Sequence, residues 1–216
     1  MNENAAKTEK ELMEALSAGD RSALKELVEK RAAAVYARCL CRLGDEADAR
    51  RAAKRTFVRL WTAGGAGAGE APLAALMRLA KRSADDVLSE REEDGKEEEP
   101  FADGLGDGER LAYALYSVGG LIHREVADAL GITLAEELNF CRSAAAKLAE
   151  TGGEAAFKER FRAPDMEADV AAACAGIKPA AAKRREIAGA LSLFWSIAGA
   201  AALIVFIIAR IARCGG

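Results

Sequence analysis

Residues 121–148 read LIHREVADALGITLAEELNFCRSAAAKL, and this stretch says most about the fold of the chain. Ala127 stands four positions before Gly131, which is followed by Ile132. In a helix-turn-helix, a small residue lets the two helices touch and a glycine adopts the left-handed turn between them. Thr133 and Glu136 then form a capping box that opens the second helix. The spacing predicts a helix-turn-helix domain over residues 108–150, although many helical hairpins share this pattern.

The residues before this stretch show helical periodicity from residue 9 to residue 90. A capping box at residues 8–11 opens the first helix, Gly–Asp pairs at 19–20 and 44–45 end one helix and begin the next, and Pro72 suits the first turn of a fourth. We therefore predict an all-α protein whose first domain, residues 9–90, is a helical bundle. The apolar positions expected to face its core include Leu24, Leu27, Val28, Val35, Cys39, Leu43, Phe57, Leu60, Trp61, Leu76, Met77 and Val87.

The net charge of -3 conceals an uneven distribution of charged residues. Residues 21–82 hold 14 Lys and Arg against 6 Asp and Glu, a net charge of +8, whereas residues 89–109 hold 2 against 10, a net charge of -8. Residues 91–107 have the composition of a solvated acidic linker between two domains. The basic block is typical of a protein that binds a polyanion or an acidic partner, but a solvated helical surface has the same composition.

A run of 23 uncharged residues, 187–209, lies near the C-terminus between clusters of Lys and Arg. As a helix it spans roughly 30 Å, the thickness of the hydrocarbon core of a bilayer. It predicts a single transmembrane helix, preceded by a juxtamembrane segment over residues 151–186. The N-terminus is polar and contains no signal peptide, so we expect the preceding domains to stay cytoplasmic, at the inner membrane of a bacterial cell. Phe157 and Phe161 in the juxtamembrane segment are expected to pack in a core, with a membrane surface as the alternative.

The sequence offers little for catalysis or metal binding. The only histidine, His123, lies in the helix-turn-helix, and the five cysteines lack the CxxC spacing of a zinc site. There is also no phosphate-binding glycine loop and no nucleophile elbow. We therefore expect neither an enzyme nor a cofactor or metal, and free thiols in a reducing compartment.

The order of the parts resembles a known family. The segments AGDRSALKELVEK, LGDEADARRAAKRTFVRLW, LAALMRLAKRSADDVL and the helix-turn-helix together look like a σ70-type sigma factor of the extracytoplasmic-function group, over roughly residues 9–150. In that family the first domain binds the clamp of core RNA polymerase and reads the promoter -10 element, and the helix-turn-helix reads the -35 element. The resemblance thus implies core RNA polymerase and promoter DNA as partners, and the predicted membrane helix adds the lipid bilayer and an anti-sigma or other membrane protein.

The resemblance also assigns two sets of residues. The set for polymerase or another protein partner is Asp48, Arg51, Lys54, Arg55 and Arg59. The set for DNA is Trp61, Arg78, Lys81, Arg82, Asn139 and Arg142. For Arg78, Lys81 and Arg82 a solvated helical face beside Asp85 and Asp86 is the alternative.

The chain departs from the family pattern at both sites. Arg51, Lys54 and Arg55 stand where the family has Asp, Gln and Glu facing the polymerase, so the local charge is reversed. Like charges at an interface can cost several kcal/mol, so the polymerase contact is either rebuilt or lost. Glu136 and Glu137 begin the expected recognition helix, where carboxylates repel the DNA backbone. An alternative function follows, a sigma-like interaction module at the membrane that no longer initiates transcription.

Overall fold

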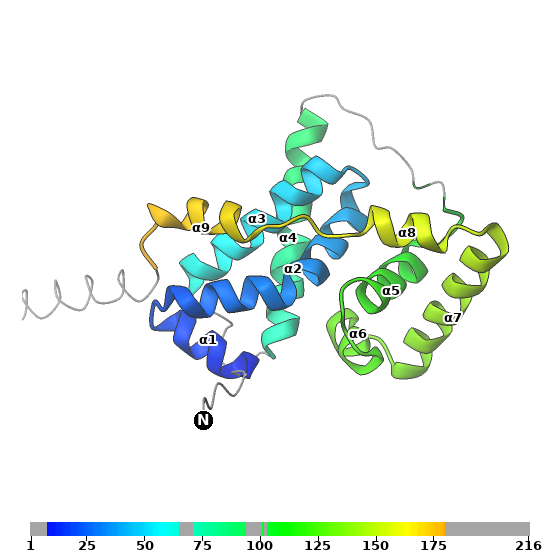
Figure 1. Ribbon diagram of the computed structural model, residues 1–216, viewed down its shortest axis with the longest axis horizontal. Helices are drawn as coiled ribbons and strands as arrows, with labels where there is room; N and C mark the ends of the chain where they lie inside the picture. The colour runs from blue at the N-terminus through cyan, green and yellow to red at the C-terminus, as the bar shows by residue number, and fades with distance from the viewer. Residues whose placement is uncertain (1–7, 65–70, 94–100, 102, 180–216) are drawn as a thin grey trace, which may run out of the picture.

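A computed structural model describes residues 8–64, 71–93, 101 and 103–179 of the chain, and over these residues it contains nine α-helices and no strand (Figure 1). The predicted all-α class is therefore confirmed for this part of the chain. The helices are α1 (Glu9–Ser17), α2 (Arg21–Leu43), α3 (Glu46–Ala63), α4 (Pro72–Glu93), α5 (Asp107–Ser117), α6 (His123–Leu130), α7 (Leu134–Thr151), α8 (Glu154–Arg160) and α9 (Glu167–Ala175).

Helices α1 to α4 form a bundle whose boundaries follow from the capping residues. The side chain of Asp20 accepts a hydrogen bond from the Ser22 amide at the start of α2, and Asp45 does the same for Asp48 in α3, each at 2.8 Å. Gly44 ends α2 with a φ of 71°, a left-handed conformation that favours glycine. The inward faces of α2, α3 and α4 bury the apolar positions predicted for the core. Helix α4 continues to Glu93, three residues beyond the predicted end of the bundle.

Helices α5, α6 and α7 form a second group, in which α6 and α7 make the helix-turn-helix. Gly131 has a φ of 68° and the Ile132 amide donates to the Ala127 carbonyl, so the turn forms at the predicted glycine. Thr133 and Glu136 make the predicted capping box at the start of α7. The buried face of α7 consists of Glu137, Cys141, Ala144 and Leu148.

The two groups pack against each other, α5 on α2 and α6 on α4. Their buried apolar residues form one continuous core. At their boundary the buried guanidinium of Arg31 in α2 forms ion pairs with Glu9 of α1 and with Glu125 of α6, the latter at 3.0 Å. A charge this well enclosed is stable only when it is paired, so the two carboxylates fix α6 against α1 and α2.

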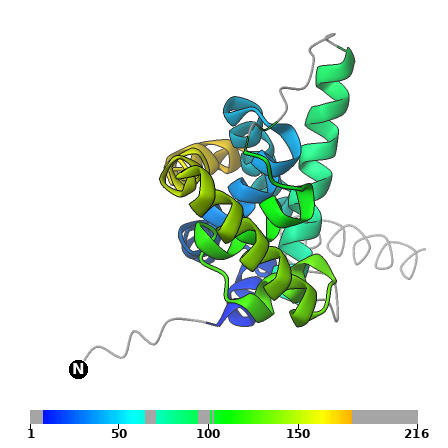
Figure 2. The same ribbon diagram turned by 90° about the vertical axis from the view of Figure 1, so that its right-hand side faces the viewer.

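The segment after α7 returns across the first bundle (Figures 1 and 2). Helix α8 packs on α7, and α9 packs on α2 and α3, so that α3 lies between α4 and α9. Phe157 and Phe161 are both buried and stack at a centroid distance of 4.4 Å. The predicted packing of this phenylalanine pair in a core is therefore confirmed. Arg160 donates to the carbonyl of Gly44 at 3.1 Å, which fixes the segment where it passes the α2–α3 turn.

Among the described residues, no helix has both the length and the hydrophobicity needed to cross a bilayer. The predicted transmembrane helix, residues 187–209, lies outside the described residues, as does the end of the juxtamembrane segment, residues 180–186.

Candidate functional site

The predicted partner face of α3 is paired with acidic residues of α4. Arg55 forms two hydrogen bonds with the Glu90 carboxylate, at 2.7 and 3.3 Å, and Arg51 approaches the same carboxylate at 3.2 Å. One turn further on, Arg59 pairs with Asp86 and donates to Ser83 at 3.1 Å. Asp48 also pairs with Arg91 of α4 at 3.9 Å, so four of the five predicted residues join α3 to α4.

This pairing gives the arginines of α3 an intramolecular role. The hydrogen bond from Arg55 lowers the pKa of Glu90 below its ordinary value, so that this carboxylate stays ionised beside the arginines. Asp48, the fourth predicted residue, is half-buried and holds Arg51 at 3.1 Å from the preceding turn of α3. Lys54, also half-buried, forms no ion pair within the described part of the chain.

Trp61, predicted to contact DNA, lies at the C-terminal end of α3 and is completely buried. Its indole Nε1 donates a hydrogen bond to the carbonyl of Ile177 at 3.0 Å, just beyond α9. A residue with 0% exposed surface cannot stack on a nucleotide. In this conformation, therefore, the tryptophan is unavailable to a nucleotide, and the backbone just beyond α9 accepts its hydrogen bond.

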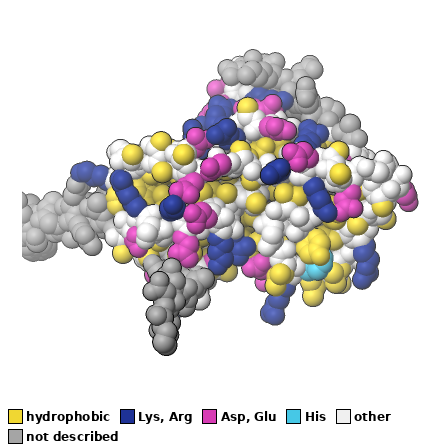
Figure 3. Space-filling view, viewed as in Figure 1, with side chains coloured by type: hydrophobic (Ala, Val, Ile, Leu, Met, Phe, Trp, Pro, Cys, Tyr) yellow, Lys and Arg dark blue, Asp and Glu magenta, His cyan; other side chains and the backbone are white. Residues whose placement is uncertain are grey.

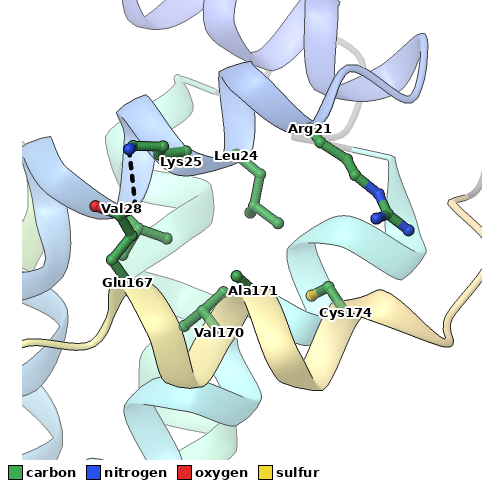
Figure 4. Close-up of a pocket in the computed structure, with 8 residues that line it drawn as sticks. All are labelled: Arg21, Leu24, Lys25, Val28, Glu167, Val170, Ala171 and Cys174. Atoms are coloured by element: carbon green, nitrogen blue, oxygen red, sulfur yellow. Dashed lines mark ion pairs between the residues drawn. The ribbon is translucent and has the colours of Figure 1, made fainter.

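Three polar contacts hold α9 on the bundle. Lys25 pairs with Glu167 at 2.9 Å, Arg50 pairs with Asp169 at 2.6 Å, and Arg21 donates to the Ala175 carbonyl at 3.1 Å. Figure 4 shows that the first pair closes one end of a cavity of about 110 Å³ between α2 and α9. Its apolar lining consists of Leu24, Val28, Val170, Ala171 and Cys174.

The other predicted DNA contacts are on the surface of two separate helices. Arg78, Lys81 and Arg82 are exposed on α4, whereas Asn139 and Arg142 are exposed on α7. The neighbouring acids Asp85 and Asp86 pair with Arg42 and Arg59. On the face shown in Figure 3, basic and acidic side chains alternate, so this face carries no continuous basic patch over the described residues.

The interior of the helix-turn-helix contains a polar cluster that the sequence analysis missed. Glu137 is completely buried on the inward stripe of α7, so the expectation that its carboxylate faces the DNA backbone is wrong. His123 Nδ1, at the start of α6, lies 3.0 and 2.9 Å from the two carboxylate oxygens of Glu137, and Cys141 donates its thiol hydrogen to Oε1 at 3.0 Å. Burial, and then the hydrogen bond to Glu137, raise the pKa of Cys141 to about 12. The sequence signal was the four-residue spacing of Glu137 and Cys141, which places both side chains on one face of a helix.

Comparison with models of protein families, with curated proteins and with solved structures gives no match to this chain.

Proposed function

We propose that this chain is a membrane-anchored, sigma-factor-like regulator of transcription initiation that binds core RNA polymerase and promoter DNA. The observation that carries the proposal is the helix-turn-helix, in which Gly131 makes the left-handed turn and α7 presents Asn139 and Arg142 to solvent. In DNA-binding proteins the outward side of the second helix is the surface that enters the major groove. The four-helix bundle that precedes it is in the order that the sequence resemblance implies.

The contacts of the C-terminal segment support a closed form as the resting state. Trp61, assigned to promoter contact by the resemblance, is buried and donates its indole hydrogen bond to the carbonyl of Ile177. The same segment leads towards residues 187–209, which we propose to anchor the chain at the inner membrane. A closed form lowers the apparent affinity for polymerase and DNA in proportion to the fraction of molecules that are open.

The second candidate, a sigma-like interaction module without transcription activity, is favoured by one specific observation. Arg51, Arg55 and Arg59 are engaged with Glu90 and Asp86 on α4, so binding a polymerase through them requires these pairs to exchange partners. Such a module would use the exposed charges of the described surface to bind another protein at the membrane.

Binding of the full-length chain in detergent to bacterial core RNA polymerase separates the two candidates. The wild type is compared with Val170→Asp, which places a carboxylate in the buried contact of α9, and with Ala172→Asp, which adds the same charge to the exposed side of α9. If one molecule in ten is open, Val170→Asp increases the polymerase affinity about tenfold. Ala172→Asp is expected to bind as the wild type does.

A reversed-charge variant tests the alternative directly. Arg51→Asp, Lys54→Gln and Arg55→Glu are combined with Glu90→Arg, which keeps an opposite-charge pair between α3 and α4. If this variant binds core polymerase while the wild type and Val170→Asp do not, the transcription proposal fails and the chain is a module for another partner. If the wild type or Val170→Asp binds and directs initiation, the alternative fails.

A further inference from the structure

We propose that His123, Glu137 and Cys141 form a binding site for a divalent transition-metal ion, Zn²⁺ in the first instance, inside the helix-turn-helix. The site would connect the first residue of α6 to the inward stripe of α7. It is independent of the proposed function, because it depends only on the geometry of these two helices.

The positions of the donor atoms carry the proposal. One atom of each side chain, the imidazole nitrogen, a carboxylate oxygen and the thiol sulfur, lies within 4.8 Å of the other two. Tetrahedral zinc sites, with bonds of about 2.0 Å to nitrogen and oxygen and about 2.3 Å to sulfur, separate their donor atoms by roughly 3.3–3.6 Å. The observed contacts of Glu137 with His123 and Cys141, at 2.9 to 3.0 Å, are a few tenths of an ångström shorter than these separations, and the remaining nitrogen–sulfur separation is at most 4.8 Å. His123 is able to move outward by this difference, because its side chain is one-third exposed.

A second, independent observation is that one oxygen of the buried Glu137 carboxylate lacks a hydrogen bond. Glu137 Oε2 is enclosed and accepts no hydrogen bond of acceptable geometry, although His123 Nδ1 lies 2.9 Å away. A carboxylate removed from water is costly unless it is fully paired or coordinates a metal. An ion at this place would supply a positive charge beside the buried carboxylate.

The chemistry of the donors selects the class of metal. Nitrogen, sulfur and oxygen together suit Zn²⁺ and related transition metals, whereas Mg²⁺ and Ca²⁺ require oxygen ligands. Binding would convert the Cys141 thiol to a metal-bound thiolate and release its proton to solvent. Three protein ligands leave a fourth position for water on the exposed side of His123. The ring of Tyr116 stacks on the His123 imidazole with a centroid distance of 4.1 Å.

The site would act on the shape of the helix-turn-helix. Its ligands fall at the start of α6 and in the first two turns of α7, next to the turn that contains Gly131. A bound ion would therefore fix the angle between the two helices. Binding of the ion would make the α7 surface that carries Asn139 more rigid relative to α6, and loss of the ion would make it more mobile.

The test is a titration of the metal-free, full-length chain with Co²⁺ and then with Zn²⁺. We expect one Co²⁺ per chain, tetrahedral absorption bands with a thiolate-to-cobalt charge-transfer band, and displacement by one Zn²⁺. Cys141→Ser should lose the charge-transfer band. His123→Phe keeps the ring that stacks on Tyr116 and should weaken Zn²⁺ binding at least about tenfold.

Cys174→Ala is the matched control, because it removes another buried cysteine, on α9, and should leave the cobalt spectrum unchanged. As a second readout, Zn²⁺ should raise the unfolding temperature of the wild type and of Cys174→Ala, but not of Cys141→Ser. An absent charge-transfer band in the wild type, or an identical band in Cys141→Ser, would overturn the proposal and leave the three residues as a buried hydrogen-bonded cluster.

Discussion

Glu109 shows how much one side chain contributes at the junction of α5 and α7. Its carboxylate accepts hydrogen bonds from Lys147 at 2.7 Å, from Ser143 at 2.6 Å and from the Gly106 amide at 2.9 Å. The hydrogen bonds from Lys147, Ser143 and Gly106 lower its pKa to about 2. Glu109 therefore caps α5 and holds α7 with the same two oxygens.

We predict that Glu109→Gln destabilises the protein by about 1–2 kcal/mol at neutral pH, since solvent screens part of the charge. A lowered pKa in the folded state stabilises the protein above the ordinary carboxyl pKa near 4.5, and this contribution is lost as the pH falls towards 2. The difference in unfolding free energy between wild type and variant should therefore be constant above about pH 5 and shrink below it. Urea unfolding of the wild type and of Glu109→Gln at several pH values measures this difference in free energy. Glu150→Gln, at an exposed position of α7, should show no such trend.

At the scale of the element, the turn between α6 and α7 depends on one backbone conformation. Gly131 has a φ of 68°, and a Cβ added there would meet no atom within 4 Å. The cost of a side chain is therefore conformational rather than steric. Sequence spacing was sufficient to locate this glycine.

We predict that Gly131→Ala lowers the free energy of unfolding by roughly 1–2 kcal/mol, the penalty of the left-handed region. Gly176→Ala is the control, because Gly176 has equally open surroundings and a φ of -92°. It should be neutral or slightly stabilising. Equal effects of the two substitutions in urea unfolding would contradict the assignment of the cost to the backbone.

The fluorescence of Trp61 measures whether α9 is docked on the bundle. In a Trp195→Phe background Trp61 is the only tryptophan of the chain. We expect its emission to be that of a buried indole, because its surface is fully covered and Ile177 accepts its hydrogen bond. Val170→Asp should shift the emission to longer wavelength and increase quenching by iodide, while Ala172→Asp should leave both unchanged. An unchanged spectrum in Val170→Asp would mean that α9 remains docked despite the buried charge.

At the scale of the whole molecule, the helices from α1 to α7 share one core, and Arg31 pairs across its boundary. A shared core predicts a single cooperative unfolding transition, with the same midpoint by circular dichroism and by tryptophan fluorescence. Two separate transitions in the wild type would show that the two helix groups unfold independently.

We further predict that Arg31→Met lowers the free energy of unfolding by about 3 kcal/mol, because Glu9 and Glu125 lose the positive charge that compensates their carboxylates. Arg42→Met removes an arginine of the same helix whose pair with Asp85 is exposed, and should cost less than about 1 kcal/mol. Chemical unfolding of both variants measures the difference. A similar decrease in unfolding free energy for the two variants would indicate that the Arg31 ion pairs stabilise the fold no more than a surface ion pair does.

The helical class, the breaks at Gly44 and Gly131, the capping boxes at Thr8 and Thr133, and the apolar faces of the helices were all predictable from the sequence. These features depend on side chains three or four residues apart and on the conformational preferences of single residues, which a linear pattern records. Three contacts required the packed structure to be seen: Trp61 donates to the Ile177 carbonyl, Arg55 pairs with Glu90, and His123 meets Glu137 and Cys141. These contacts join positions 14 to 116 residues apart, and they depend on how whole helices dock, which the periodicity of each helix does not specify.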